Sequence, residues 1–125
     1  MEIHDKVSRI IHQYQPDKIF THSSDDPLSD HNALNKFVTD LCNETDYKGE
    51  VYSFDVWTPF KIKERNLPKL YIDISKTFGK KIASLKCFES QWMSMISLLW
   101  SVYYRAIRNG IKARCMFAEV FYRIR

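Results

Sequence analysis

At 125 residues, the chain is long enough for one domain that buries roughly two-thirds of its unfolded surface, and its hydrophobic content of 45% excludes a disordered protein. Only 3 glycines and 4 prolines are present, which argues against a turn-rich β-sandwich. The net charge of +4 favours anionic partners slightly, but it gives no strong nucleic-acid signal, which would require a concentrated basic face.

The cysteines indicate a reducing compartment. Cys42, Cys87 and Cys115 are odd in number, far apart and without metal-ligand spacing, so we expect free thiols in a cytoplasmic protein. The charged N-terminal stretch MEIHDKVSR lacks the apolar segment of a signal peptide. The most apolar stretch, residues 92–104, contains three serines and is too short for a membrane span.

The N-terminal half alternates between predicted helix and strand. Apolar residues at helical spacing predict a helix over residues 2–14, and residues 18–21 predict a short buried strand. The polar segment FTHSSDDPLSDH ends this strand and leads into a helix that Ser29 or Asp30 can cap. This order is typical of a parallel α/β sheet, in which ligands bind beyond the carboxyl ends of the strands.

The C-terminal half predicts two strands, two helices and a closing strand. Residues 50–57 and 70–74 are rich in β-forming side chains. Helices are expected from Ser75 to about Glu89 and from Gln91 to Arg108, and the segment 116–122 is strand-like.

The second of these helices is apolar around most of its circumference, so we expect it to be buried on several sides. The pair Asn109-Gly110 predicts its end. The aromatic residues expected in the core are Trp92, Trp100, Tyr103 and Tyr104. The basic residues expected to form a solvated rim, or to contact a substrate phosphate, are Arg105, Arg108, Lys112, Arg114, Arg123 and Arg125.

The segment PDKIFTHSSDDPLSDHNAL resembles the second motif of the PIG-L/LmbE family of zinc-dependent N-acetylglucosaminyl deacetylases. That motif places D-x-H-x-D-H after an apolar strand and Thr-His. Asp26, Asp30 and His31 match it, whereas Leu28 stands where its first histidine is expected. The segments VYSFDVWTPF, KKIASLKCFESQ and AEVFYR are similar to later parts of the family, so the likeness covers nearly the whole chain.

The resemblance implies a Rossmann-like three-layer α/β/α fold, with residues 1–125 as a single, incomplete domain that lacks the first strands. It implies a zinc cofactor held by His31, and Asp30, Asp26 and His22 as candidate catalytic residues. The substrate class it implies is an N-acetylglucosamine-containing conjugate. The family's His-Pro-Asp-Asp-Glu motif, which supplies two further ligands and the general base, is absent from the sequence. We therefore expect activity to be impaired or absent unless another segment completes the site.

Several alternatives stay open at this point. His22 and Asp25 have the spacing of the ligands in the absent motif, with Asp26 as a base, although the order differs. Asp30 could orient its neighbours or cap a helix, and His31 could be a histidine that pairs with a nearby carboxylate at a helix N-terminus. Leu28 cannot donate a hydrogen bond to a developing negative charge, which weakens the case for catalysis.

A second hypothesis is therefore a non-catalytic carbohydrate-binding or assembly module with the same fold. The expected partners are a sugar-conjugate substrate and either a second copy of the chain or a complementing segment.

Overall fold

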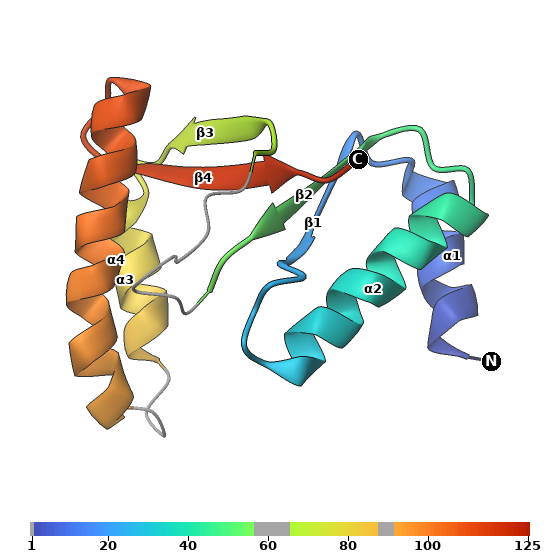
Figure 1. The fold of residues 1–125 in the computed structure, drawn as a ribbon, viewed down its shortest axis with the longest axis horizontal. Coiled ribbons are helices and arrows are strands. Elements are labelled where there is room, and N and C mark those ends of the chain that lie inside the picture. The colour runs from blue at the N-terminus through green and yellow to red at the C-terminus, as the bar shows by residue number, and fades with distance from the viewer. Residues whose placement is uncertain (1, 57–65, 88–91) are drawn as a thin grey trace. The chain divides into compact units, whose positions relative to one another are not determined.

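A computed structural model of the chain describes residues 2–56, 66–87 and 92–125. Within them, four helices accompany a four-stranded sheet of order β1-β2-β4-β3 (Figure 1), which confirms the α/β class. The helices are α1 (Ile3–Tyr14), α2 (Ser29–Glu44), α3 (Phe78–Lys86) and α4 (Trp92–Ala113). The strands are β1 (Lys18–His22), β2 (Glu50–Phe54), β3 (Lys69–Asp73) and β4 (Ala118–Arg123).

The sheet is mixed, so the expectation of a parallel sheet is only partly correct. β1 and β2 are parallel, with Lys18 opposite Glu50 and His22 opposite Phe54. β4 runs antiparallel to β2. The chain divides into two compact units: the first holds α1, α2, β1, β2 and the end of β4, and the second holds β3, α3, α4 and the start of β4.

The core of the first unit lies among its two helices and the parallel strand pair. Its buried residues are Ile11 of α1, Leu41 and Cys42 of α2, Tyr47 and Val51. Of the apolar positions on these helices, Val7 and Ile11 of α1 and Phe37, Val38 and Leu41 of α2 join this core. Ile3, Ile10 and Tyr14 of α1 are exposed instead.

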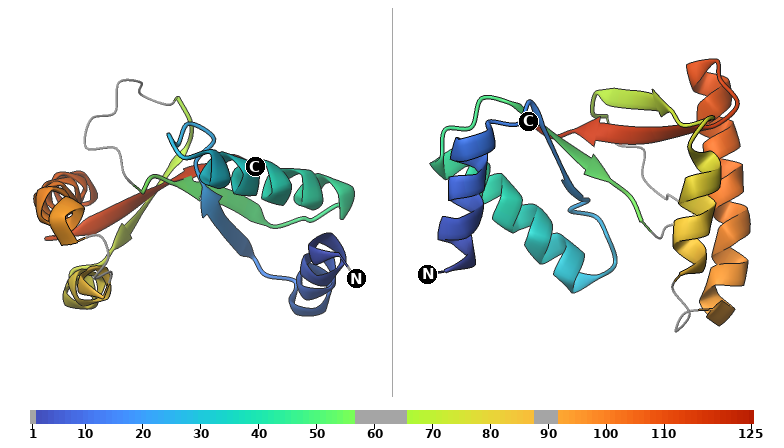
Figure 2. Two further views of the ribbon diagram at one scale, coloured as in Figure 1. Left: turned by 90° about the horizontal axis from the view of Figure 1, so that it is seen from below. Right: turned by 180° about the vertical axis from the view of Figure 1, so that it is seen from behind.

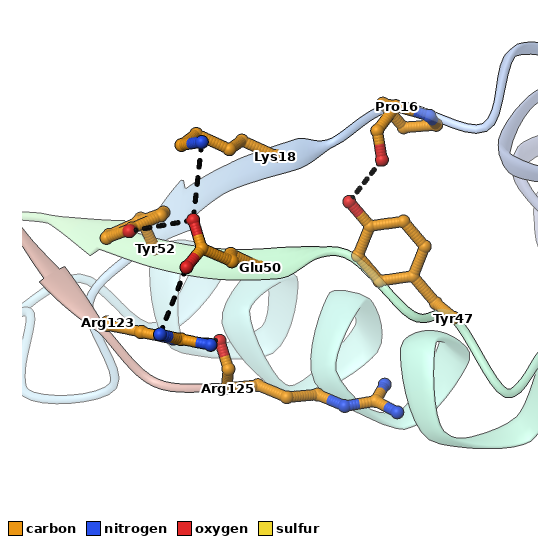
Figure 3. Close-up of polar contacts among 7 residues, drawn as sticks. All are labelled: Pro16, Lys18, Tyr47, Glu50, Tyr52, Arg123 and Arg125. Atoms are coloured by element: carbon orange, nitrogen blue, oxygen red, sulfur yellow. Dashed lines mark hydrogen bonds and ion pairs between the residues drawn. The ribbon is translucent and has the colours of Figure 1, made fainter.

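Charged side chains join the three strands of the first unit at the amino end of the parallel pair (Figure 3). The Glu50 carboxylate accepts a hydrogen bond from the Tyr52 hydroxyl at 3.0 Å and lies 3.3 Å from the Lys18 ammonium. Its second oxygen lies 3.0 Å from the Arg123 guanidinium. The bond from Tyr52, with Lys18 and Arg123 nearby, holds the pKa of Glu50 below its usual value. The amino end of the strands is therefore neutralised by close ion pairs.

The second unit packs α3 against α4, which lie side by side in the views of Figures 1 and 2. Its buried cluster consists of Phe78, Ile82 and Ala106, and the Phe78 ring stacks on Phe117 with centroids 4.0 Å apart. Among the residues of α4 whose side chains are described, Leu99, Val102 and Ala106 take part, and the Tyr103 ring touches Phe78 edge to face.

The predicted burial of α4 is consequently wrong where its side chains are described. Trp100 is 57% exposed, Tyr103 42% and Tyr104 55%. Trp100 and Tyr104 lie outside the cluster around Phe78, whereas the Tyr103 ring meets the Phe78 ring edge to face, 4.9 Å between centroids. The side chain of Trp92 lies outside the described part of the chain. Apolar residues around most of a helix therefore do not by themselves predict that the helix is buried on several sides.

The predicted end of α4 at Asn109-Gly110 is also wrong, because the helix continues to Ala113. The glycine serves a close approach: a Cβ at Gly110 would lie 2.5 Å from the Met116 carbonyl oxygen. The Cys115 amide donates to the Gly110 carbonyl at 2.9 Å, and the chain reverses through Arg114, whose φ is 59°. Gly110 therefore permits the return of the chain beside the helix.

The other boundaries are close to those predicted. α3 begins three residues after Ser75, because Asp73 accepts hydrogen bonds from both the amide and the hydroxyl of Ser75 and holds it in a turn. Residues 57–65, which lie between the two predicted strands and include the last residue of the first, are outside the described residues. So are residues 88–91, which include the end of the predicted helix at Glu89.

We expect Leu41→Ala to lower the free energy of unfolding by about 2–5 kcal/mol, because Leu41 is 1% exposed and its removal leaves a cavity. Leu34 lies on the same helix but is 44% exposed, so Leu34→Ala should change stability by less than about 0.5 kcal/mol. Urea unfolding followed by circular dichroism measures both variants. Equal effects would contradict the assignment of this core.

Candidate metal centre

Three potential metal ligands converge at the carboxyl end of β1. His22 is the last residue of the strand, Asp26 lies in the following loop, and His31 is in the first turn of α2. One ligand atom from each residue lies within 4.8 Å of the other two. The structure thus brings together residues from the strand, the loop and the helix in the position where open α/β sheets bind ligands.

Short local hydrogen bonds shape the loop. The Ser23 hydroxyl accepts from the Asp25 amide at 3.1 Å, and Asp26 Oδ1 accepts from the Leu28 amide at 3.0 Å. The Asn32 side chain donates to the Asp26 carbonyl at 2.9 Å. Turns of this kind are the usual role of Ser and Asp in loops, and here they leave Oδ2 of Asp26 available to other groups.

The start of α2 differs from the prediction that Ser29 or Asp30 caps it. Leu28 occupies the N-cap position in an extended conformation, and no side chain caps the helix. The Asp26 turn holds the Leu28 amide, so the helix starts earlier than the sequence suggests and Asp30 falls within its first turn. Its side chain carboxylate then lies at the positive end of the helix dipole.

A buried amide ties the helix to the strand. Asn35 is 8% exposed and donates from Nδ2 to the backbone carbonyl of His22 at 2.7 Å. Since Asn35 lies one helical turn after His31, this bond holds both histidines in one place. Asn35 belongs to no recognisable motif; its only signal is that of a polar residue among the apolar positions of α2.

The two imidazole rings stack, with centroids 3.8 Å apart and 13° between their planes. His31 Nδ1 is buried and lies 3.0 Å from Asp26 Oδ2. Nδ1 of His22 is also buried and has no hydrogen-bond partner. Phe54 closes one side, 4.8 Å from the His22 ring between centroids.

The protonation states follow from this crowding. Burial and the adjacent His31 lower the pKa of His22, against the opposing influence of Asp26. Burial would raise the pKa of Asp26, but the short contact with His31, the Leu28 amide and the charge of both imidazoles outweigh it, so this pKa is also lowered. His22 is therefore neutral and Asp26 ionised near neutral pH. Neutral imidazole and carboxylate are the forms that bind metal ions.

The donor set fits a zinc ion. Two imidazoles and one carboxylate are a common ligand combination for zinc in hydrolytic sites, where a fourth position stays open. The buried Nδ1 of His22 has no hydrogen-bond partner, which is costly, and a cation beside the ionised Asp26 carboxylate would satisfy it. The residues present therefore fit a bound divalent cation.

The structure places the predicted site residues as follows. His22, Asp26 and His31 lie together, with the Asp26 side chain 2% exposed. Asp30 is exposed and outside this group, with its carboxylate 3.4 Å from the Ser29 hydroxyl. The loop places Asp26 beside the histidines and leaves Asp25 exposed. This arrangement favours Asp26 over Asp25 as a metal ligand.

The fold is similar to those of two solved enzymes. One is a deacetylase of the teicoplanin biosynthesis pathway, with a TM-score of 0.75 and 16% identity over 96% of this chain and 50% of that one. The other is GalB, the 4-carboxy-2-hydroxymuconate hydratase of Pseudomonas putida KT2440, with a TM-score of 0.75 and 18% identity over 98% and 57% of the two chains. No protein-family model and no curated protein sequence matches. The chain has a deacetylase-like fold and spans about half the length of these enzymes.

We expect Asn35→Ala to lower the free energy of unfolding by about 1–3 kcal/mol, since the buried carbonyl of His22 loses its donor. Asn43→Ala, at an exposed position near the end of the same helix, is the matched control and should have a much smaller effect. Urea unfolding compares the two. A loss no greater for Asn35→Ala than for the control would show that this bond does not hold the centre.

Proposed function

We propose that the chain carries a zinc-dependent hydrolytic centre of the deacetylase type, with His22, Asp26 and His31 as its protein ligands. The observation that carries this proposal is the convergence of ligand atoms of the three side chains within 4.8 Å, with the buried Nδ1 of His22 left without a hydrogen-bond partner and that of His31 lying 3.0 Å from the Asp26 carboxylate. Zinc, when bound, polarises an amide carbonyl and makes water a nucleophile near neutral pH.

The residues of the chain then have separate tasks. The Asn35 amide and the Asp26 turn orient the ligands. Phe54 limits the access of water to the His22 ring. Asp30, exposed in the first turn of α2, is the group proposed to accept a proton from the attacking water and to return it to the leaving amine. The reaction consumes one water and converts an acetamide into a free amine and acetate.

Two lines of support point to this reaction class. Both similar enzymes are named for reactions in which water is a reactant, a deacetylation and a hydration. The resemblance of residues 16–34 to the PIG-L/LmbE motif points to an N-acetylglucosamine-containing conjugate as the substrate. The Rossmann-like three-layer arrangement and a cytoplasmic location belong to the same proposal.

The proposal includes a complementing segment or partner. β1 is the terminal strand in the sheet order, and Phe20 on it is 42% exposed. On α1, Ile3, Ile10 and Tyr14 are exposed as well. An open strand edge beside apolar side chains is suited to pairing with a further strand. Such a strand would end near His22 and could add groups to the centre.

One observation favours the second hypothesis, a non-catalytic carbohydrate-binding or assembly module. Leu28 is 48% exposed beside the centre and has no donor for a developing oxyanion. The loss of one such donor costs on the order of a hundred-fold in rate or more. In this case the metal would order the loop without supporting turnover.

Zinc binding by the purified chain tests the ligand set. We expect about one zinc per chain, with His31→Ala and Asp26→Asn each weakening binding by about tenfold or more, because even groups that only support metal ligands contribute this much. His12→Ala is the matched control, since His12 is exposed on α1. Competition with a chromophoric chelator measures the affinities. Equal binding by His31→Ala and His12→Ala would refute the proposed centre.

Leu28→His distinguishes the two hypotheses. If the centre is hydrolytic, the added donor should raise the rate of acetate release from N-acetylglucosamine conjugates on the order of a hundred-fold. Leu28→Met keeps an apolar side chain without a strong donor and should leave the rate unchanged. A zinc-loaded chain that binds the sugar but releases no acetate, with or without Leu28→His, would support the binding module instead.

A further inference from the structure

The described part of α4 carries an exposed apolar face in the second unit. Trp100, Tyr104, Ile107 and Ile111 follow one another at the spacing of one side of a helix. Their exposed fractions are 57%, 55%, 46% and 73%. Tyr103 borders them and is 42% exposed. A contiguous apolar stripe of this kind on a surface marks an interaction site more often than scattered single residues do.

The core of the unit does not use this face. Leu99, Val102 and Ala106 lie on the other side of the helix and pack with the cluster around Phe78. The aromatic rings of the face contact one another, with Trp100 and Tyr104 centroids 6.4 Å apart. The apolar stripe therefore does not contribute to the packing of α4 in its own unit, and its exposure needs a separate explanation.

Positive charge is concentrated in the same part of the chain. Residues 69–120 hold nine Lys and Arg against three Asp and Glu, a net charge of +6. Because the whole chain has a net charge of +4, the remaining residues sum to −2. Such an asymmetry between parts of a chain suggests an anionic partner for one of them.

The charges stand next to the apolar face. Arg108 and Lys112 are exposed and follow Ile107 and Ile111 by one position each, so they lie along one edge of the stripe. The Arg108 guanidinium lies 5.9 Å from the centroid of the Tyr104 ring. The sequence contains no acidic residue from 92 to 118. The neighbouring helix α3 adds three lysines and no acid among residues 78–86, although Lys81 pairs with Glu119.

We propose that this face of α4 binds the surface of an anionic lipid bilayer, with the helix lying in the plane of the interface. Trp and Tyr favour the headgroup level, isoleucines enter the acyl boundary, and Arg and Lys beside them meet acidic headgroups. No helix among the described residues is long and apolar enough to cross a membrane, so the contact is peripheral. This inference is independent of the proposed metal centre.

Charge favours a bilayer over a second copy of the chain. In a symmetric pair of α4 helices, the Arg108 and Lys112 edges of both copies would lie at one small interface, where like charges repel. An anionic bilayer neutralises the same residues. The combination of apolar stripe and basic edge therefore fits acidic lipid better than self-association.

Co-sedimentation with vesicles tests the inference, using phosphatidylcholine vesicles with and without phosphatidylserine. We expect partitioning only onto the vesicles that contain phosphatidylserine, and weaker partitioning as salt rises. The double variant Arg108→Glu/Lys112→Glu should lower the partition coefficient by about twentyfold or more, from roughly fivefold for each basic residue. Lys6→Glu/Lys36→Glu makes the same change of net charge on exposed positions of α1 and α2, and should have a much smaller effect.

A second pair of substitutions separates insertion from general attraction. Ile107→Ser/Ile111→Ser keeps every charge and should lower partitioning by at least tenfold, at about 0.8 kcal/mol for each buried CH₂ lost. Circular dichroism and urea unfolding establish that each variant keeps its fold. These two positions are exposed, so the substitutions should not unfold the unit.

Three results would overturn the inference. The first is absence of binding to phosphatidylserine vesicles. The second is a pattern of non-specific attraction to charge. It would appear as an equal loss of partitioning for the α4 and control charge variants, or as no loss of partitioning for the isoleucine variant. The third is a concentration-dependent dimer that Ile107→Ser/Ile111→Ser dissociates, which would assign the face to a second copy of the chain.

Discussion

The candidate centre depends on one buried hydrogen bond, from the Asn35 side chain to the backbone carbonyl of His22. A strand and a helix joined by a polar loop have many ways to meet, and a ligand site needs only one of them. The bond fixes the first turns of α2 against the end of β1, so that His31 lies over His22 at 3.8 Å between ring centroids. A buried carbonyl without its donor would destabilise the fold, which makes other arrangements of the helix unfavourable.

The two ends of the parallel strands show opposite ways of treating charge. At the amino end, Glu50 has a cation on each carboxylate oxygen and a hydroxyl as well, so its interactions are satisfied within the first unit. At the carboxyl end, the Asp26 carboxylate lies 3.0 Å from one of two stacked imidazoles, and Nδ1 of the other has no hydrogen-bond partner. Structural ion pairs are normally completed, as around Glu50. Unsatisfied donors and acceptors that converge are typical of a site that awaits a ligand.

Periodicity and strand chemistry predicted much of the fold. α1, β1 and β2 were found because their apolar spacing decides their conformation locally, and the position of His31 at the start of a helix followed from the loop beside it. The sequence could not predict that Leu28 would be the N-cap, and it could not decide between Asp25 and Asp26 as the aspartate beside the histidines, because turns within the loop determine both. The sequence predicts a helix end at Gly110. In the structure this glycine instead allows the close approach of Met116, a contact that exists only in the folded unit.

The exposure of α4 is the largest difference between the structure and the sequence prediction, and it has a physical reason. Apolar content reports how favourable burial would be, but not whether the chain itself supplies the burying surface. In the second unit the cluster around Phe78 covers one side of α4, and the opposite apolar side has no counterpart in that cluster. The proposed contact with a bilayer accounts for the apolar surface of α4 that its own unit leaves uncovered. The basic residues along its edge support this contact, since they favour a surface that is itself negatively charged.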